Sequence, residues 1–174
     1  MLKTKPASRY RFRDVCREDF PLLAQWLAEP HVARWWGEPS TELGSIEEAM
    51  TSEETRPMIV ELDGKPIGYL QSYDPHLEEG HPYQDQPKGT LGIDISIGIP
   101  ELTDKGHGAA IIRQFTSELF ADGAKRIVID PDPENLRAIR AYEKAGFRYV
   151  DTRTSIYGPA HFMALDAPEE TDLP

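Results

Sequence analysis

The chain has 174 residues, which suits a single domain with a substantial apolar core, and no repeat or shift in composition marks a second domain. A hydrophobic content of 39% is that of a folded protein rather than a disordered one. The formal net charge of −11 disfavours a nucleic-acid partner, and it is compatible either with a cationic small-molecule substrate or simply with solubility.

The cysteines, histidines and chain ends limit the class of protein further. Cys16 is the only cysteine, which excludes an intramolecular disulfide and a cysteine metal cluster, and the five histidines show no metal-ligand spacing. Residues 1–6 lack the apolar core of a signal peptide, and no segment is long enough to span a membrane. We therefore expect a cytoplasmic protein without a metal or a membrane partner. A single domain over 1–174 is expected, with an ordered core over about 10–165 and a flexible acidic tail over 166–174.

The first third of the chain predicts a strand followed by a helix. Residues 10–13 alternate in polarity as a strand does. Apolar residues at helical spacing then predict a helix that begins near Pro21 and ends before Pro30. The adjacent Trp35 and Trp36 cannot both face one core from a helix, so we expect one in the core and the other at a cleft or the surface.

A short helix and a hairpin are expected next. Residues 45–50 form a plausible short helix with two glutamates in its first turn. Residues 57–62 and 65–73 read as two strands, and the Asp63-Gly64 dipeptide between them is the best hairpin turn in the chain.

Residues 74–88 form a long loop that proline and glycine break repeatedly. Loops of this length in compact domains are usually functional or mobile. His76, His81 and Tyr83 are therefore candidates for substrate contact, and the alternative for each is a place in a solvated, flexible loop.

Residues 90–99 are the strongest strand in the sequence. Its leucine and isoleucines share one face, whereas Asp94, Ser96 and Gly98 share the other. A polar row on a central strand predicts a site. A buried carboxylate needs a partner or a function, so Asp94 is either a site residue or a hydrogen-bonded structural aspartate.

A loop over 100–108 leads into a helix whose expected inward residues run from Ile111 to Leu119. Backbone N–H groups in a glycine-rich turn at a helix N-terminus bind phosphate. The candidate phosphate-binding residues are Lys105, Gly106, His107, Gly108 and Ala109.

Residues 126–129 form a buried strand, and Asp130 stands at its end. An amphipathic helix follows, which we expect Asp132 to cap and Pro133 to open, and Gly146 suits its C-terminal stop. Two closing strands are expected over 147–151 and 161–165, around a turn at residues 157–159.

The helix also carries a motif that an ordinary amphipathic helix does not explain. Its residues resemble the N-x-x-A-x-x-x-Y-x-K-x-G-F signature of the GNAT superfamily of acetyl-CoA-dependent N-acetyltransferases, through Asn135, Ala138, Tyr142, Lys144, Gly146 and Phe147. The family's loop pattern Q/R-x-x-G-x-G/A fits Gly106 and Gly108 but departs at Thr103. The resemblance implies an α/β (α+β) GNAT fold with a central mixed, mostly antiparallel sheet of about seven strands flanked by helices.

Three further segments narrow the resemblance. Residues 35–37, 68–73 and 92–94, together with the 135–147 run, look like the aminoglycoside 6'-N-acetyltransferases, whereas loop 74–88 does not obviously match. The implied cofactor is acetyl-CoA, with Asn135 at the pantetheine arm, Ala138 allowing close approach and Tyr142 near the thioester sulfur.

The implied reaction is acetyl transfer to a primary amine of a polycationic aminosugar. Asp94 would hold the ammonium and take its proton, Tyr142 would protonate the leaving thiolate, and amides beside Ile97 and Gly98 would polarise the thioester carbonyl. Asp130 would hold a second ammonium. The remaining pocket residues are Trp36, Gln71 and Tyr73. The alternatives are a core role for Tyr142 and a helix-entry cap for Asp130.

Other acceptors remain open at this point. A siderophore precursor, a polyamine or a peptide amine would suit the same fold, and a non-enzymatic module that binds CoA or an aminosugar is a further alternative. The intact Asn135, Ala138, Tyr142 and glycine pair favour an enzyme, and the carboxylates Asp94 and Asp130 favour a cationic acceptor. The sequence is compatible with a monomer or a homodimer.

Overall fold

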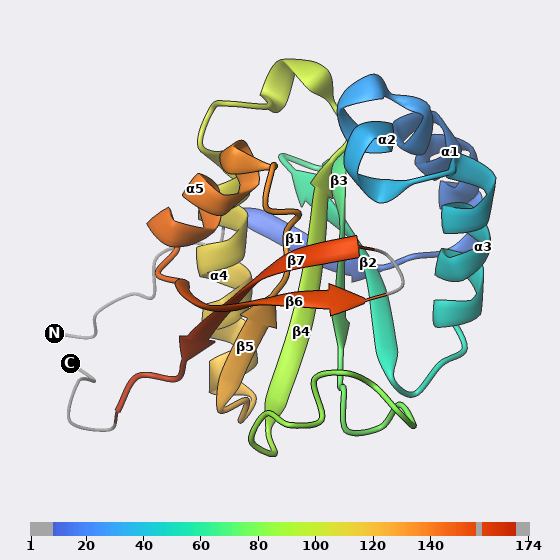
Figure 1. The fold of residues 1–174 in the computed structure, drawn as a ribbon. Helices are drawn as coiled ribbons and strands as arrows, with labels where there is room; N and C mark the ends of the chain where they lie inside the picture. Colours follow the sequence, from blue (N-terminus) through green and yellow to red (C-terminus); the bar gives the residue numbers. More distant parts are fainter. Residues whose placement is uncertain (1–8, 156–157, 170–174) are drawn as a thin grey trace, which may run out of the picture.

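A computed structural model describes residues 9–155 and 158–169, and these form a seven-stranded sheet flanked by five α-helices (Figure 1). Residues 1–6, where no signal peptide is expected, and most of the predicted tail lie outside the described residues. Of the turn predicted over 157–159, Tyr157 is not described, whereas Gly158 and Pro159 belong to β7, so the turn is predicted too far along the chain. The strands are β1 (Tyr10–Asp14), β2 (Thr55–Leu62), β3 (Lys65–Tyr73), β4 (Thr90–Ile97), β5 (Arg126–Ile129), β6 (Arg148–Ser155) and β7 (Gly158–Asp166). The helices are α1 (Phe20–Ala28), α2 (Pro30–Trp36), α3 (Pro39–Ala49), α4 (His107–Ala121) and α5 (Leu136–Lys144).

The sheet has the order β1-β2-β3-β4-β5-β7-β6, and it is mixed and mostly antiparallel, as the resemblance implies. Among the strand pairs of the described residues, only the central β4–β5 pair is parallel. These two strands pair from Thr90 to Gly92 on β4, whereas β4 continues to Ile97 without a described partner on that side. The sheet therefore opens between β4 and the end of β5.

Two apolar clusters cover the two faces of the sheet. Helices α4 and α5 pack on one face over the larger cluster, and α1 to α3 pack on the other over a smaller one (Figure 1). Strand β2 shows the expected alternation, because Met58 and Val60 enter the larger cluster and Ile59 enters the smaller. The predicted hairpin turn is confirmed, with φ angles of 51° at Asp63 and 77° at Gly64.

Two helix starts differ from the sequence prediction. Helix α3 begins at Pro39 rather than at residue 45, because the Glu38 carboxylate accepts the N–H groups of Ser40 and Thr41 at 3.0 and 2.8 Å. The two predicted first-turn glutamates thus lie in its last turn.

Helix α5 begins at Leu136 and its cap is Asn135, whose side chain accepts the Ala138 N–H at 3.3 Å. Asp132 instead accepts the N–H of Glu134 at 2.8 Å, before the helix. Among the described residues, no helix is both long and apolar enough to cross a membrane.

Candidate active site

The opening beside β4 is a cleft of about 770 Å³. Ile95, Ser96 and Ile97 of β4 line one wall, and α5 lines the other. The α5 wall includes Asn135, Ala138 and Tyr142, so the structure brings these three predicted residues to one surface. Trp36 of α2 also borders the cleft.

The glycine-rich turn forms one end of this cleft. Gly106 precedes α4 with a φ of 81°, and the first backbone bond of the helix runs from the Ala110 N–H to the Gly106 carbonyl. The N–H groups of His107, Gly108 and Ala109 precede that bond and therefore have no partner within the helix. A Cβ on Gly106 would meet no protein atom within 4 Å, so the space before these donors is open.

The side chains of the turn differ in what they can contribute. Lys105 is exposed, whereas His107 is buried and its Nδ1 lies 2.8 Å from the Tyr10 hydroxyl. Only the backbone of His107 therefore faces the open space. A cofactor role stays a prediction for both residues, through the exposed side chain of Lys105 and through the backbone N–H of His107.

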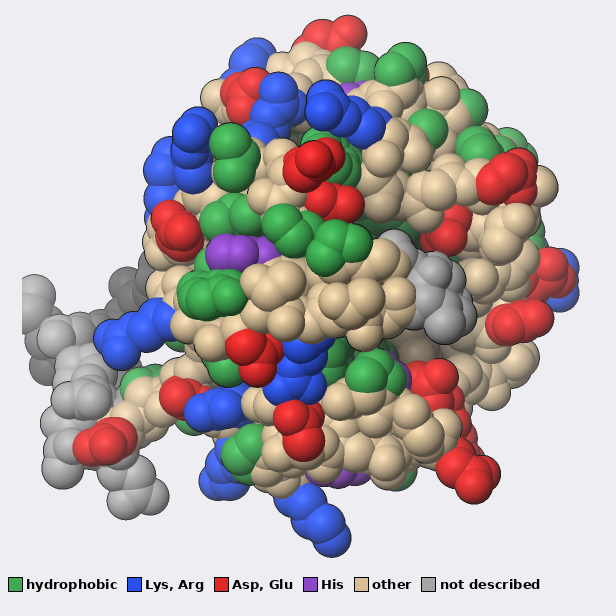
Figure 2. Space-filling view, in the orientation of Figure 1, with side chains coloured by type: hydrophobic (Ala, Val, Ile, Leu, Met, Phe, Trp, Pro, Cys, Tyr) green, Lys and Arg blue, Asp and Glu red, His purple; other side chains and the backbone are tan. Residues whose placement is uncertain are grey.

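Cationic side chains gather at the mouth of the cleft, and Figure 2 shows Lys and Arg grouped over the upper left of the molecule, where α5 lies. The cleft-lining cations are Arg34, Arg137, Arg140 and Lys144. A basic mouth, unpaired N–H groups at a helix N-terminus and a narrow channel along β4 fit the phosphates and the extended arm of coenzyme A.

Of the two amides predicted to act at the end of β4, only the one at Ile97 faces the cleft. The Gly98 N–H donates to the Ile67 carbonyl at 2.9 Å, so this amide, predicted to polarise a thioester, is already engaged. Because antiparallel pairs alternate, the neighbouring Ile97 N–H and C=O point away from β3 and toward the opening. His31, which the sequence gave no reason to select, lies with its Nε2 2.8 Å from the Ile97 carbonyl.

Asp94 lies beside Gln71 across the β3–β4 ladder. The Gln71 Nε2 donates to Asp94 Oδ2 at 2.8 Å, and the Tyr69 hydroxyl donates to Gln71 Oε1 at 2.7 Å. Tyr69 thereby fixes which end of the amide faces Asp94. Burial and, after it, the nearby charge of Asp130 raise the pKa of Asp94, the Gln71 hydrogen bond opposes the rise, and the pKa is about 7 as a result.

The predicted aromatic pocket residues lie around this pair. The Tyr73 ring lies directly against Gly92, where a Cβ would be 1.9 Å from the ring. The Trp36 ring packs edge-on against Tyr69 at 5.7 Å and joins the smaller apolar cluster. The adjacent Trp35 also borders the cleft, with the Arg34 guanidinium over its ring. The predicted division, with one tryptophan in the core and the other at the cleft, is therefore not found, because both are half-buried at the cleft and only Trp36 also packs against the smaller cluster.

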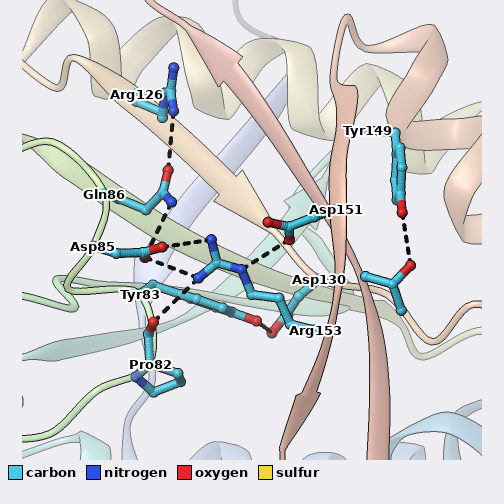
Figure 3. A network of polar contacts seen from close by, with 10 residues as sticks. Pro82, Tyr83, Asp85, Gln86, Arg126, Asp130, Tyr149, Asp151 and Arg153 are labelled. Carbon is cyan, nitrogen blue, oxygen red and sulfur yellow. Dashed lines mark hydrogen bonds and ion pairs between the residues drawn. The ribbon is translucent and has the colours of Figure 1, made fainter.

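Asp130 is held by loop 74–88. The Tyr83 hydroxyl donates to Asp130 Oδ2 at 2.5 Å (Figure 3). The Tyr83 ring is buried against Phe162 of β7. The flexible-loop alternative is therefore wrong for Tyr83, and a helix-capping role does not describe Asp130. Burial raises the pKa of Asp130, while the Tyr83 hydrogen bond and His81 oppose the rise. The described hydrogen bonds of His76 stay within the loop, from its N–H to Asp74 Oδ1 and between its ring Nε2 and the Pro87 carbonyl.

Tyr142 approaches the two carboxylates from the opposite face of the sheet, where it belongs to the larger cluster. Burial, and then the charges of Asp94 and Asp130, raise the pKa of Tyr142, so its hydroxyl keeps its proton at neutral pH. Sequence reasoning missed a third carboxylate, Glu42 of α3, whose charge also raises the pKa of Asp94. Glu42 was missed because the sequence predicted this helix only from residue 45, whereas α3 begins at Pro39.

Residues 15–154 match the model of the Acetyltransferase (GNAT) domain family. The chain is 37% identical over 161 residues to the aminoglycoside N(6')-acetyltransferase type 1 of Klebsiella pneumoniae, covering 87% of this chain and 80% of the relative. It is 29% identical over 157 residues to the N-hydroxyputrescine acetyltransferase of Acinetobacter baumannii, covering 84% and 75%.

Solved structures give the same picture. The aminoglycoside acetyltransferase AAC(6')-Ib in complex with coenzyme A and kanamycin superposes with a TM-score of 0.81 at 34% identity, over 90% of this chain and 94% of that chain. The complex of AAC(6')-Ib with ribostamycin and coenzyme A gives a TM-score of 0.84 at 34% identity, over 94% and 98%.

Proposed function

Because the chain belongs to the GNAT family and uses acetyl-CoA as its acetyl donor, we propose that its acceptor is the 6'-amine of an aminoglycoside. The observation that carries this proposal is the pair of carboxylates, Asp94 and Asp130, that lie close enough to interact beside the cleft. Two carboxylates suit an acceptor with more than one ammonium group. The similarity to AAC(6')-Ib in complex with kanamycin supports the same acceptor class.

Asp94 is the proposed general base. An ammonium cannot attack a carbonyl carbon, so the acceptor must first lose a proton. A carboxylate with a pKa of about 7 is suited to this step, because at neutral pH it is partly ionised and still basic enough to accept a proton, directly or through water. The Gln71 hydrogen bond occupies Oδ2 and leaves Oδ1 for the acceptor.

Tyr142 and Ile97 are proposed to act on the donor. When bound, acetyl-CoA supplies the thioester carbonyl that the amine attacks. The Ile97 N–H, which points into the opening, can donate a hydrogen bond to that carbonyl oxygen. The Tyr142 hydroxyl, which stays protonated, can give its proton to the departing sulfur.

The remaining residues are proposed to bind the acceptor. Asp130 would hold a second ammonium group, and Glu42 would add to the negative field that attracts a polycation. Trp36, Gln71 and Tyr73 would shape the pocket around the sugar ring.

A second candidate acceptor is N-hydroxyputrescine, the acceptor named for the Acinetobacter baumannii relative. The departure of loop 74–88 from the aminoglycoside pattern gives this candidate its weight, because the loop reaches Asp130. A linear diamine derivative also carries a cationic group that two carboxylates can hold.

The test is acetyl-CoA-dependent thiol release with three acceptors: kanamycin, an analogue with a hydroxyl in place of the 6'-amine, and N-hydroxyputrescine. We expect release with kanamycin and none with the hydroxyl analogue. Release with N-hydroxyputrescine alone would transfer the function to the second candidate. Binding of acetyl-CoA without release from any acceptor would contradict both.

A further inference from the structure

Loop 74–88 reaches Asp130 through the buried side chain of Tyr83, beside which the His81 ring packs on Tyr73 at 5.4 Å. Tyr83 is only 5% exposed, and its ring packs against Phe162 at 4.6 Å within a cluster that also contains Val128 and Ala164. From there its hydroxyl reaches Asp130 Oδ2. The proposed second ammonium site therefore has one oxygen occupied by the protein and one, Oδ1, left for a ligand.

Arg153 of β6 holds the loop on both sides of that tyrosine, through the backbone of Pro82 and the side chain of Asp85 (Figure 3). Its guanidinium donates to the Pro82 carbonyl at 3.3 Å and to both oxygens of Asp85 at 3.0 and 2.9 Å. Its Nε donates to Asp151 on its own strand at 3.0 Å. The guanidinium also lies over the Phe162 ring at 4.2 Å. The side chain thus spans the gap between the sheet and the loop.

We infer that Tyr83 and Arg153 are positioning residues for the acceptor. Arg153 fixes the loop at Pro82 and Asp85, the fixed loop places the Tyr83 hydroxyl on Asp130, and that hydrogen bond orients the carboxylate with Oδ1 toward the ligand. This inference rests on the proposed function. Because the chain of contacts ends at the second ammonium and not at the reacting amine, it governs acceptor binding rather than the acetyl transfer step.

The first test is a double-mutant cycle between Tyr83→Phe and Asp130→Asn, with kcat and KM measured for kanamycin and for acetyl-CoA. We expect Tyr83→Phe to raise the kanamycin KM about tenfold, as loss of one hydrogen bond to a charged group implies. We expect kcat and the acetyl-CoA KM to stay within about twofold. In the Asp130→Asn background the Tyr83→Phe change should have little further effect, because its partner charge is gone.

The second test places Arg153→Gln in the wild-type and Tyr83→Phe backgrounds. Arg153→Gln should raise the kanamycin KM in the wild-type background and much less in the Tyr83→Phe background. Arg153→Lys should restore only part of the lost affinity, because lysine lacks the planar guanidinium of arginine. Arg56→Gln, which breaks an exposed ion pair with Asp14, is the matched control and should change neither KM. The unchanged acetyl-CoA KM reports that each variant is folded.

The outcomes separate the two proposals. Wild-type protein that fails to acetylate kanamycin overturns the proposed function and this inference with it. Wild-type protein that acetylates kanamycin, with Tyr83→Phe and Asp130→Asn effects that simply add, overturns the inference alone. A fall in kcat in Tyr83→Phe or Arg153→Gln, with no change in the kanamycin KM, would overturn the inference as well.

Discussion

At the scale of single residues, the pKa of Asp94 depends on its neighbour Asp130. Burial and, after it, the charge of Asp130 raise that pKa, which is about 7 as a result. Removing that charge with Asp130→Asn should lower the Asp94 pKa. Asp94 must be ionised to accept a proton, so activity falls as pH drops through its pKa. The acid limb of the kcat/KM profile should therefore move to lower pH.

The measurement is kcat/KM for kanamycin from pH 5 to pH 9 in the wild type and the variant. Glu42→Gln is a useful comparison, because Glu42 is the smaller contributor to the same pKa and should shift the limb less in the same direction. A limb that stays in place or moves to higher pH in Asp130→Asn would remove Asp94 as the titrating base.

The proposed role of Tyr142, protonation of the departing thiolate, can be tested separately. Its hydroxyl is buried, and both carboxylates disfavour its ionised form, so it is a donor and not a base at neutral pH. Tyr142→Phe should lower kcat about 10²-fold, the contribution typical of a general acid, with the kanamycin KM little changed. Single-turnover thiol release would separate this step from product release. An unchanged kcat would leave Tyr142 as a core tyrosine only.

At the scale of elements, Asn135 caps a helix and has a proposed second role in binding the cofactor. Its Oδ1 caps α5 by accepting the Ala138 N–H, while its Nδ2 is available to the cleft. Asn135→Ala removes both and should cost about 1 kcal/mol of stability as well as raise the acetyl-CoA KM. Asn135→Ser keeps the cap, so it should restore the stability and leave the KM raised. Thermal unfolding and acetyl-CoA titration of both variants check this, and a normal KM in the serine variant would contradict the cofactor role.

The sequence predicted the strands better than the helix starts or the loop. Period-two alternation in β4 set Asp94 on the polar face, and the Asp63-Gly64 turn placed β3 beside the right partners. The start of α3 was missed because a glutamate cap before proline is a weaker signal than serine or aspartate.

No pattern in the sequence predicted the contact between Tyr83 and Asp130. It joins residues 47 apart through a segment without periodicity, and only the position of β7 beneath the loop determines it. Pattern reasoning could mark loop 74–88 as a candidate for function. It could not tell which of the three aromatic or histidine side chains turns inward.

At the scale of the whole molecule, groups of opposite charge lie on the two faces of the sheet, near the same opening. The cleft mouth on the α5 side is cationic although the chain has a net charge of −11, and the carboxylates lie on the face covered by α1 to α3. Beside the unpaired part of β4, Tyr142 from the α5 side lies near enough to Asp94 and Asp130 for their charges to raise its pKa. An anionic donor and a cationic acceptor are thus drawn to the same gap from opposite sides.

This arrangement has a cost in stability that can be measured. The Asp94 pKa is 3.8 in an unstructured chain and about 7 in the folded protein, which corresponds to roughly 4 kcal/mol. A raised carboxyl pKa opposes folding once the group is charged, so the penalty is fully present at pH 8, shrinks as pH falls through 7 and vanishes below about 4. Asp94→Asn keeps the shape and removes the charge. It should raise Tm by roughly 8–16 °C at pH 8 and by less than half of that at pH 5, while abolishing acetyl transfer. Asp122→Asn, at an exposed aspartate that ends α4, is the matched control and should leave both quantities unchanged. Equal stabilisation at the two pH values would mean that altered packing, and not the lost charge, is responsible.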